Sequence, residues 1–467
     1  MPPVSERAAR VRFRRALSLM AMTLVAPGSA QLVAGNRRVG LVALRIWVCL
    51  LGLLALTLLA IAVHRDLVFW LGFNTALLLL LRLALIAAAI GWALLLVDAW
   101  RLGQPLSLGL GHRRAVISVN GVLCLTVAGS LLFGAHLAGV QRDLIVTLAG
   151  DGEVTDAHDG RFNVLLMGGD SGAGRWGLRP DSMTIASIDA DTGRTVLISL
   201  PRNMENFPFR EGTVMDEQFP DGFTCDGCYL NGVSTWAGDN TQLFPTSDNP
   251  GVDATVMAVE GITGLRVNYW AMVNLEGFKS LVDAVGGVEL TVRDPIPVGG
   301  LGSDVTGYLE PGTRQLDGFE TLWYARAREG SDDYSRMARQ KCVMNAMLRQ
   351  VSPQQALANF EDLARASTEL LSTNLPGSEF DTFLSLALKA RDQKISTLSL
   401  VPPMINPAEP DIDLIQDRVD AAIDQAEGTA PPPSTRKKAP ETVTGGSIGS
   451  RDEGYAANEA EDLGTAC

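Results

Sequence analysis

The chain has 467 residues and a formal net charge of −13, but its charges are divided unevenly along the sequence. Residues 1–139 carry 13 Arg and three acidic residues, a net charge of +10, whereas residues 140–467 carry 26 basic and 49 acidic residues, a net charge of −23. This division excludes a single soluble domain, and the acidic majority argues against a nucleic-acid partner, which requires a basic face.

The first segment contains three stretches that are apolar and long enough to cross a bilayer, whose ~30 Å hydrocarbon core requires about 20 apolar residues in a helix. They are residues 39–63, 67–97 and 115–138. A fourth uncharged stretch, residues 16–34, is interrupted by Pro27-Gly28-Ser29. We predict three transmembrane helices within residues 39–139, preceded by a cytoplasmic N-terminus (residues 1–38) that contains an interfacial or re-entrant segment.

The arginines of this segment indicate its orientation, because short cytoplasmic loops carry an excess of Lys and Arg. Three crossings leave the Arg-rich N-terminus and the loop with Arg101, Arg113 and Arg114 on the same side. Four crossings would place them on opposite sides. We therefore predict a multi-pass protein of the cell membrane whose residues 140–467 lie outside the cytoplasm.

Arg82 lies inside the second apolar stretch. A charged side chain is costly there and is a candidate functional residue by default. The alternative is structural: the helix shifts so that Arg82 snorkels to the interface, or the side chain faces the helix bundle.

Two of the six cysteines, Cys49 and Cys124, fall in predicted membrane helices. The other four are Cys225, Cys228, Cys342 and Cys467, an even number in an oxidising compartment, and they allow three pairings. A single CxxC without a second pair or a nearby His is weak evidence for zinc. A local disulfide is therefore favoured over a redox or half-zinc motif, which by elimination leaves Cys342 to pair with Cys467.

Strands and helices alternate in the second segment, as judged from hydrophobic periodicity and turn residues. Strands are predicted at residues 163–167, 182–188, 195–200, 269–273, 288–292 and 395–401, and helices at residues 252–262, 275–285, 332–351, 354–371 and 380–391. This pattern predicts a layered α/β/α domain on a central mixed sheet. We place the domain at residues 161–404, after a linker of residues 140–160 and before a polar, largely disordered tail of residues 405–467.

The glycine-rich run at residues 168–174 does not fit a nucleotide site. No Gly-Lys-Ser/Thr follows it, and its spacing differs from the GxGxxG of dinucleotide-binding folds. It is better described as a turn that carries one carboxylate, Asp170.

Arginines and three aspartates recur at or near the ends of predicted elements. They are Asp170, Arg179, Asp181, Arg202, Arg326, Arg328, Asp333, Arg336 and Arg339. An i, i+2 pair in an extended segment, Arg326 and Arg328, would point to one face. Guanidinium groups bind phosphate bidentately, and carboxylates hold Mg²⁺ beside phosphate oxygens, so this set suits a pyrophosphate and a divalent ion. A solvated network of ion pairs is the alternative that spacing alone leaves open.

Five motifs in this order resemble the LytR-CpsA-Psr family. They are residues 163–171 (NVLLMGGDS), 179–183 (RPDSM), 199–203 (SLPRN), 282–288 (VDAVGGV) and the Arg-rich block 326–340. The resemblance covers about residues 161–350, and it is closest to the actinobacterial members with several membrane helices before the domain.

The resemblance implies a phosphotransferase that moves a polyprenyl-pyrophosphate-linked glycan onto peptidoglycan and releases polyprenyl phosphate beside the lipid bilayer. It implies that Asp170 and Asp181 hold Mg²⁺. The pyrophosphate would be bound by Arg179, Arg202, Arg326 and Arg328, with Arg339 and Gln340 at the same site. Asp333, or one of the two metal ligands, is the candidate base.

Two other functions stay open at this point. The same site would hydrolyse polyprenyl pyrophosphate if water replaced the acceptor hydroxyl, or the chain would be a non-catalytic regulator of the cell envelope or an attenuator of transcription. The identity of the glycan, whether arabinogalactan, teichoic acid or capsule, is not encoded in these residues, because the pyrophosphate site would be common to all.

Overall fold

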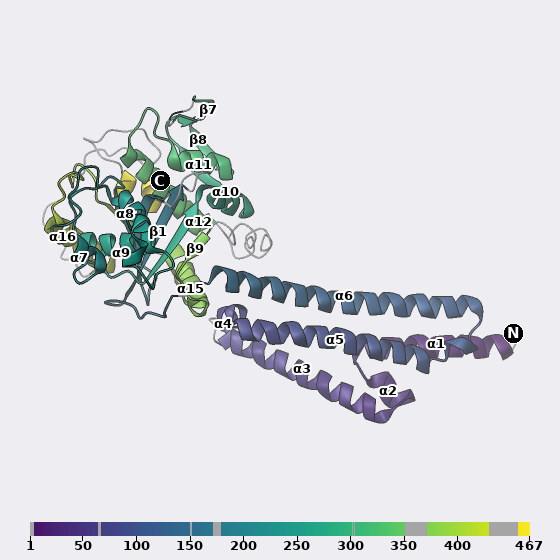
Figure 1. The fold of residues 1–467 in the computed structure, drawn as a ribbon. Helices are drawn as coiled ribbons and strands as arrows, with labels where there is room; N and C mark the ends of the chain where they lie inside the picture. The colour runs from purple at the N-terminus through teal and green to yellow at the C-terminus, as the bar shows by residue number, and fades with distance from the viewer. Residues whose placement is uncertain are drawn as a thin grey trace. The chain divides into compact units, whose positions relative to one another are not determined.

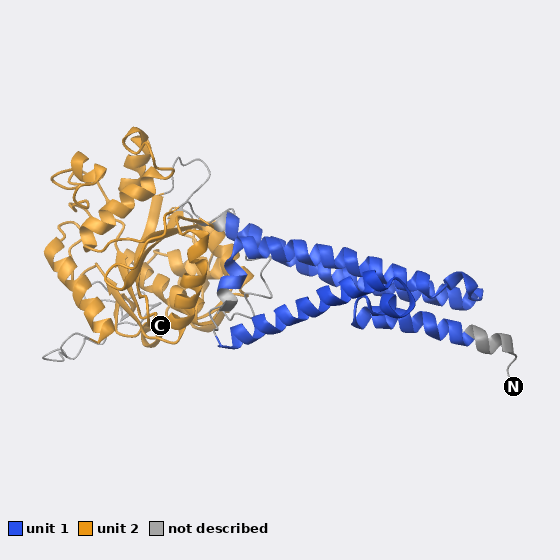
Figure 2. Cartoon of the chain, turned by 90° about the horizontal axis from the view of Figure 1, so that it is seen from below, with its two compact units in different colours: residues 1–146 blue, residues 147–467 orange. Residues whose placement is uncertain are grey.

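A computed structural model of the chain describes residues 4–63, 67–149, 152–170, 179–300, 302, 304–350, 371–428 and 456–467. The chain divides into two compact units, residues 1–146 and residues 147–467, shown in blue and orange in Figure 2. Three predicted features lie outside the described residues: residues 354–370 of the predicted helix 354–371, residues 171–174 of the glycine-rich run, and the Pro-rich part of the tail at residues 431–449.

The first unit is entirely helical in its described residues. Its helices are α1 (Val4–Val25), α2 (Ser29–Ala34), α3 (Arg37–Val63), α4 (Leu67–Phe73), α5 (Thr75–Leu102) and α6 (Leu110–Leu148). Three segments within the described residues are long and apolar enough to cross a membrane, namely Arg37–Val63, Thr75–Ser107 and Leu110–Val146. The second predicted stretch is divided because Asn74 accepts a hydrogen bond from the Leu77 backbone and so begins a new helix.

The predicted break in the N-terminal segment lies at Gly28. Helix α1 ends at Val25 and α2 begins at Ser29, and Gly28 between them has a φ of 94°. A β-carbon at Gly28 would lie 2.6 Å from the carbonyl oxygen of Gly40, so the close approach to α3 requires glycine. The segment is therefore two helices joined by a tight turn.

The second unit is built on a seven-stranded mixed sheet in the order β11-β10-β3-β2-β1-β4-β9. The strands are β1 (Arg161–Asp170), β2 (Arg179–Asp189), β3 (Thr195–Leu200), β4 (Tyr269–Asn274), β9 (Leu371–Thr373), β10 (Ile395–Ser399) and β11 (Glu459–Ala460). The β1–β4 and β3–β10 pairs are parallel and the other pairs are antiparallel. Two small antiparallel sheets pair β5 (Val288–Val292) with β8 (Gly312–Leu316) and β6 (Ile296–Val298) with β7 (Gly307–Leu309).

Helices cover both faces of this sheet (Figure 1). One face packs on α8 (Val233–Asp239), α9 (Pro250–Thr263) and α16 (Ile412–Glu427), with the short α7 (Val214–Gln218) beside them. The other packs on α10 (Leu275–Ala284), α11 (Gly318–Arg326), α12 (Asp333–Gln350), α15 (Phe380–Arg391) and α17 (Leu463–Ala466). Every residue of β3 is buried, as expected for a strand covered on both faces. The predicted α/β/α fold is therefore confirmed.

Two predicted boundaries are wrong. Helix α6 continues to Leu148, so the linker does not begin at residue 140. The predicted disordered tail contains α16, which buries Ile415 and Val419, and its last twelve residues supply β11, the edge strand that pairs with β10. The overall polarity of this region concealed apolar residues at helical spacing that belong to the domain core.

The structure contains two disulfides, both in the second unit. Cys225 is bonded to Cys228, and Cys342 of α12 is bonded to Cys467. Cys49 and Cys124 are free thiols. The second disulfide attaches the C-terminus to α12, the helix that also carries several of the predicted site residues.

Candidate active site

Two of the predicted site residues meet at one edge of the central sheet. In the antiparallel β2–β3 pair, Met183 lies opposite Leu200. Asp181 precedes Met183 by two residues and Arg202 follows Leu200 by two, so the register brings them side by side. Arg202 Nη1 lies 2.6 Å from Asp181 Oδ1.

A β-bulge at this edge sets the position of Asp181. Gly168 pairs with Ser182 and Gly169 pairs with Pro180, which leaves Asp181 as the extra residue of β2. Bulges bend a strand locally and redirect a side chain, and they are common beside active sites. The backbone of Asp170 pairs with that of Arg179 one step further along, so both predicted metal ligands belong to the same end of neighbouring strands.

Helix α12 supplies the second carboxylate and an arginine from its first turn. Asp333 accepts hydrogen bonds from Arg336, with Nε at 3.0 Å from Oδ1 and Nη2 at 2.9 Å from Oδ2. Arg336 Nη2 also donates to the backbone carbonyl oxygen of Asp181 at 3.0 Å, which connects the helix to the sheet edge. Arg336 belongs to the set of residues that suits a pyrophosphate, but the family resemblance assigned it no role. Its i, i+3 spacing from Asp333 was the available signal.

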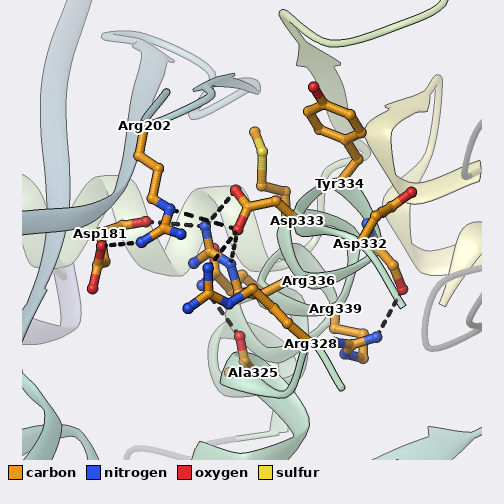
Figure 3. A network of polar contacts seen from close by, with 12 residues as sticks. Asp181, Arg202, Ala325, Arg328, Asp332, Asp333, Tyr334, Arg336 and Arg339 are labelled. Atoms are coloured by element: carbon orange, nitrogen blue, oxygen red, sulfur yellow. Dashed lines mark hydrogen bonds and ion pairs between the residues drawn. The ribbon is translucent and has the colours of Figure 1, made fainter. Parts of the chain in front are cut away.

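Two more arginines, from other parts of the chain, lie near Asp333 (Figure 3). Its Oδ1 lies 3.7 Å from Arg202 Nε and 3.6 Å from Nη1 of Arg328, which follows α11. We call Arg202, Arg328 and Arg336, together with Asp181 and Asp333, the arginine cluster. Its three cations and two anions leave one positive charge uncompensated within the set.

The electrostatics of the cluster favour an added anion. Burial opposes the ionisation of Asp333, but the charge and hydrogen bonds of Arg336, with Arg202 and Arg328, outweigh it and lower the pKa of Asp333. Burial and the neighbouring guanidinium of Arg202 lower the pKa of Arg328. An anion placed between these guanidinium groups would relieve their mutual repulsion. A carboxylate whose pKa is held low is also a poor base.

Arg339 and Gln340 of α12 contact the C-terminal turn of α11. The Arg339 side chain is 1% exposed, and it donates to the carbonyl oxygens of Tyr324, at 2.7 Å, and of Ala327. Gln340 Nε2 donates to the carbonyl oxygen of Ala325 at 3.2 Å. These carbonyls are the ones that the end of a helix leaves without intrahelical partners. Arg339 and Gln340 therefore hold the Arg326–Arg328 segment against α12, which is a supporting position for the predicted pyrophosphate site.

Arg326 and Arg328 do not form the extended pair that their spacing suggested. A capping box between Asp317 and Glu320 begins α11, and the helix continues to Arg326. The Arg326 guanidinium stacks on Trp323, with its carbon 5.1 Å from the ring centroid. Arg328 alone of the two reaches Asp333.

Arg179 is connected to the cluster through Asn231, which the sequence reasoning missed. Arg179 Nη2 donates to Asn231 Oδ1 at 2.9 Å, and the Asn231 backbone N–H donates to the Arg202 carbonyl oxygen at 3.0 Å. Asn231 is 4% exposed and lies in the short 3-10 helix η2 (Leu230–Gly232), far from both arginines in sequence. No motif spacing marks such a residue.

Residues near the C-terminus of the chain bind α12. Lys341 is fully buried, and its Nζ donates to Ser399 Oγ at 2.6 Å and to Asn458 Oδ1 at 2.9 Å. Burial, together with the charge of Arg336, lowers the pKa of Lys341 to about 7. With the Cys342–Cys467 disulfide, this contact makes the C-terminal segment part of the support for the arginine cluster.

The donor set fits a divalent ion only in part. Asp181 is 39% exposed on its side chain and uses Oδ1 for Arg202. Within the described residues, no group of three or more His, Cys, Asp or Glu side chains is placed to hold a metal. Mg²⁺ is commonly held by one or two carboxylates with substrate phosphates completing the shell, so Asp181 and the adjacent position Asp170 are compatible with it.

Comparisons with known proteins agree on a single family. A sequence model of the LytR_cpsA_psr family matches residues 138–406. Biofilm regulatory protein A of Streptococcus mutans is 25% identical over 56% of this chain and 61% of its own length. The polyisoprenyl-teichoic acid–peptidoglycan teichoic acid transferase TagV of Bacillus subtilis is 26% identical over 53% of this chain and 58% of its own length. The crystal structure of B. subtilis TagV covers 59% of this chain and 100% of that one, with 23% identity and a TM-score of 0.43.

Proposed function

The chain belongs to the LytR_cpsA_psr family, and from this we propose that it transfers a polyprenyl-pyrophosphate-linked cell-wall glycopolymer to peptidoglycan and releases polyprenyl phosphate. A relative that carries a transferase name of this kind supports the proposal. The match covers less than two thirds of that relative, so the reaction is proposed for this chain from its own site.

The observation that carries the proposal is the composition of the arginine cluster. Three guanidinium groups from separate parts of the chain converge on Asp333 within 3.7 Å, in a unit that is strongly acidic overall. Asp181 and Asp333 compensate two of these three positive charges, and an added anion would compensate the third. Planar guanidinium groups match phosphate oxygens bidentately, which makes a pyrophosphate the ligand that this geometry fits best.

In the proposed reaction, an acceptor hydroxyl of peptidoglycan attacks the phosphorus that carries the glycan. The bond from this phosphorus to the bridging oxygen breaks, that oxygen leaves as part of polyprenyl phosphate, and the proton of the hydroxyl passes to solvent. Arg202 and Arg328 neutralise the charge that spreads over the phosphate oxygens, since catalysis of phosphoryl transfer consists mainly of positioning and electrostatic stabilisation. Asp333 keeps the three guanidinium groups in place, and we assign it a positioning role instead of the role of base.

We also propose that Asp170 and Asp181 hold Mg²⁺ when substrate is bound. The ion would supply Lewis acidity and neutralise charge on the pyrophosphate. Pairing of the β1 and β2 backbones places the two residues at the same end of the sheet, which supports this assignment.

The site has to lie on the side of the membrane where peptidoglycan is found. Three helices are long and apolar enough to anchor the chain in a bilayer. The Arg-rich N-terminus and the Arg101 to Arg114 loop favour a cytoplasmic location for those regions, and an odd number of crossings then leaves residues 147–467 extracytoplasmic.

The proposal is tested by substitution in cells that depend on this chain for wall assembly. Arg202→Ala and Asp181→Ala are expected to abolish attachment of the glycopolymer to peptidoglycan, measured as wall-bound glycan after lipid extraction. Arg266→Ala is the matched control, because its side chain is 58% exposed and lies 3.8 Å from a different carboxylate, Glu260. Normal attachment in both site variants would refute the enzyme and leave a regulatory role.

A further inference from the structure

The charged residue inside the second apolar stretch, Arg82, lies between two membrane helices in the first unit. Arg82 belongs to α5, and its guanidinium contacts Gly139 of α6. A β-carbon at Gly139 would lie 3.0 Å from Arg82 Nη1 and 3.3 Å from its Nε. The absence of a side chain at Gly139 therefore leaves room for the guanidinium, and a larger residue there would push against it.

Arg82 lies on the packed face of α5. Leu78 and Ala89, one turn before it and two turns after it, are 7% and 2% exposed. The Arg82 side chain itself is partly exposed, so it borders the helix interface without being enclosed by it. A molecule that diffuses within the bilayer can reach it laterally.

No carboxylate among the described residues pairs with Arg82. Asp143 pairs with its neighbour Arg142, and Asp98 accepts a hydrogen bond from Gln31. A cation inside an apolar membrane segment is costly and is normally paired. Among the described residues the neighbouring helices supply no such partner, so an anion from the membrane would complete the charge balance at this place.

The guanidinium lies close to the polar end of the α5–α6 pair. Gly139 precedes the polar run Gln141-Arg142-Asp143 by two residues, about 3 Å along a helix. Gln141 Nε2 donates to the carbonyl oxygen of Gly72, beside the start of α5, at 3.3 Å. The Cα–Cβ bond of a helical residue tilts toward the helix N-terminus, which directs Arg82 toward this polar level.

We propose that Arg82 and the gap at Gly139 form an intramembrane site for the phosphate of an anionic lipid. Guanidinium binds such a phosphate through two parallel hydrogen bonds. On the topology proposed above, the site opens to the outer leaflet. The inference goes beyond the proposed reaction, because it concerns a second site that is separate from the arginine cluster. Two lipids share the chemistry, a polyprenyl monophosphate and a bulk phospholipid such as phosphatidylglycerol.

The test uses the full chain in phosphatidylcholine nanodiscs and counts retained anionic lipid by native mass spectrometry. The chain carries Arg202→Ala and Arg328→Ala, so that the proposed active site does not contribute. Polyprenyl monophosphate and phosphatidylglycerol are titrated separately. Retention of either one supports the site and identifies its source, and retention of neither overturns the proposal.

Variants then assign the lipid to Arg82. Arg82→Gln and Gly139→Val are each expected to weaken lipid retention at least about ten-fold, the effect of losing a charge-assisted hydrogen-bonding group. Gly129→Val is the matched control, since a β-carbon there meets no atom within 4 Å. Retention that Arg82→Gln leaves unchanged overturns the proposal. Because no transfer is measured, the result is independent of whether the proposed reaction is correct.

Discussion

Replacement of Asp333 by Asn separates the positioning role of this residue from the role of base. The change keeps the shape of the side chain and removes the charge that Arg202, Arg328 and Arg336 share. The side chain is 19% exposed, so its ion pairs are mostly shielded from water. Removing one partner of a fully buried pair costs about 3–5 kcal/mol, and partial exposure reduces this to about 2 kcal/mol here.

The pH dependence of the stability lost in Asp333→Asn follows from the lowered pKa of Asp333. A carboxylate whose pKa is lower in the folded state stabilises the fold above its unfolded pKa, about 3.9, and this contribution is lost as pH falls through the folded pKa. The difference in unfolding free energy between the wild-type chain and Asp333→Asn should therefore be full at pH 6 and should shrink below about pH 4. Urea unfolding of residues 147–467, followed by tryptophan fluorescence, measures it.

The control and the kinetic comparison make the interpretation specific. Asp411→Asn changes an N-cap of α16 to another good N-cap residue, so it should alter stability by less than about 0.5 kcal/mol. A base contributes about 10²–10⁴-fold to the rate. A loss of that size in kcat for Asp333→Asn, without any loss of stability, would refute the positioning role.

Two further predictions concern the support behind α12. Cys467→Ser opens a disulfide with a sequence separation of 125 and should lower the unfolding free energy by about 2–4 kcal/mol in non-reducing urea titrations. Dithiothreitol should have the same effect on the wild-type chain. An unchanged midpoint of unfolding would contradict this prediction. The pKa of Lys341 is lowered to about 7 in the folded chain. Between about pH 7 and 10.4 the unfolded chain therefore binds one proton more than the folded chain, and the unfolding free energy should rise with pH in that window. Lys341→Met should remove this rise, and a wild-type minus variant difference that does not change with pH would show that Lys341 does not titrate there.

The elements with clear periodicity were predictable from the sequence. Strand β3, strand β5 and helix α15 have the predicted bounds, because each is a short apolar or amphipathic run between turn residues. Helix α16 was not predicted, since its many acidic residues hide the apolar face that Ile415 and Val419 bury.

The site was predictable as a set of residue types but not as a geometry. Sequence spacing indicated that Asp181 and Arg202 lie at element ends, and the β2–β3 register brings them together. Spacing could not show that Arg339 points into the protein, because that depends on how α11 packs on α12. The bridge through Asn231 likewise exists only in the folded chain.

The most direct test of the proposed reaction follows both products in vitro. The full chain in detergent is given a polyprenyl-pyrophosphate-linked glycan, labelled in both its glycan and its lipid, with and without peptidoglycan. The proposed transfer predicts polyprenyl monophosphate and peptidoglycan-bound glycan in equal amounts, and neither product without acceptor. Release of free glycan phosphate at the same rate without peptidoglycan would instead establish hydrolysis and contradict the transferase.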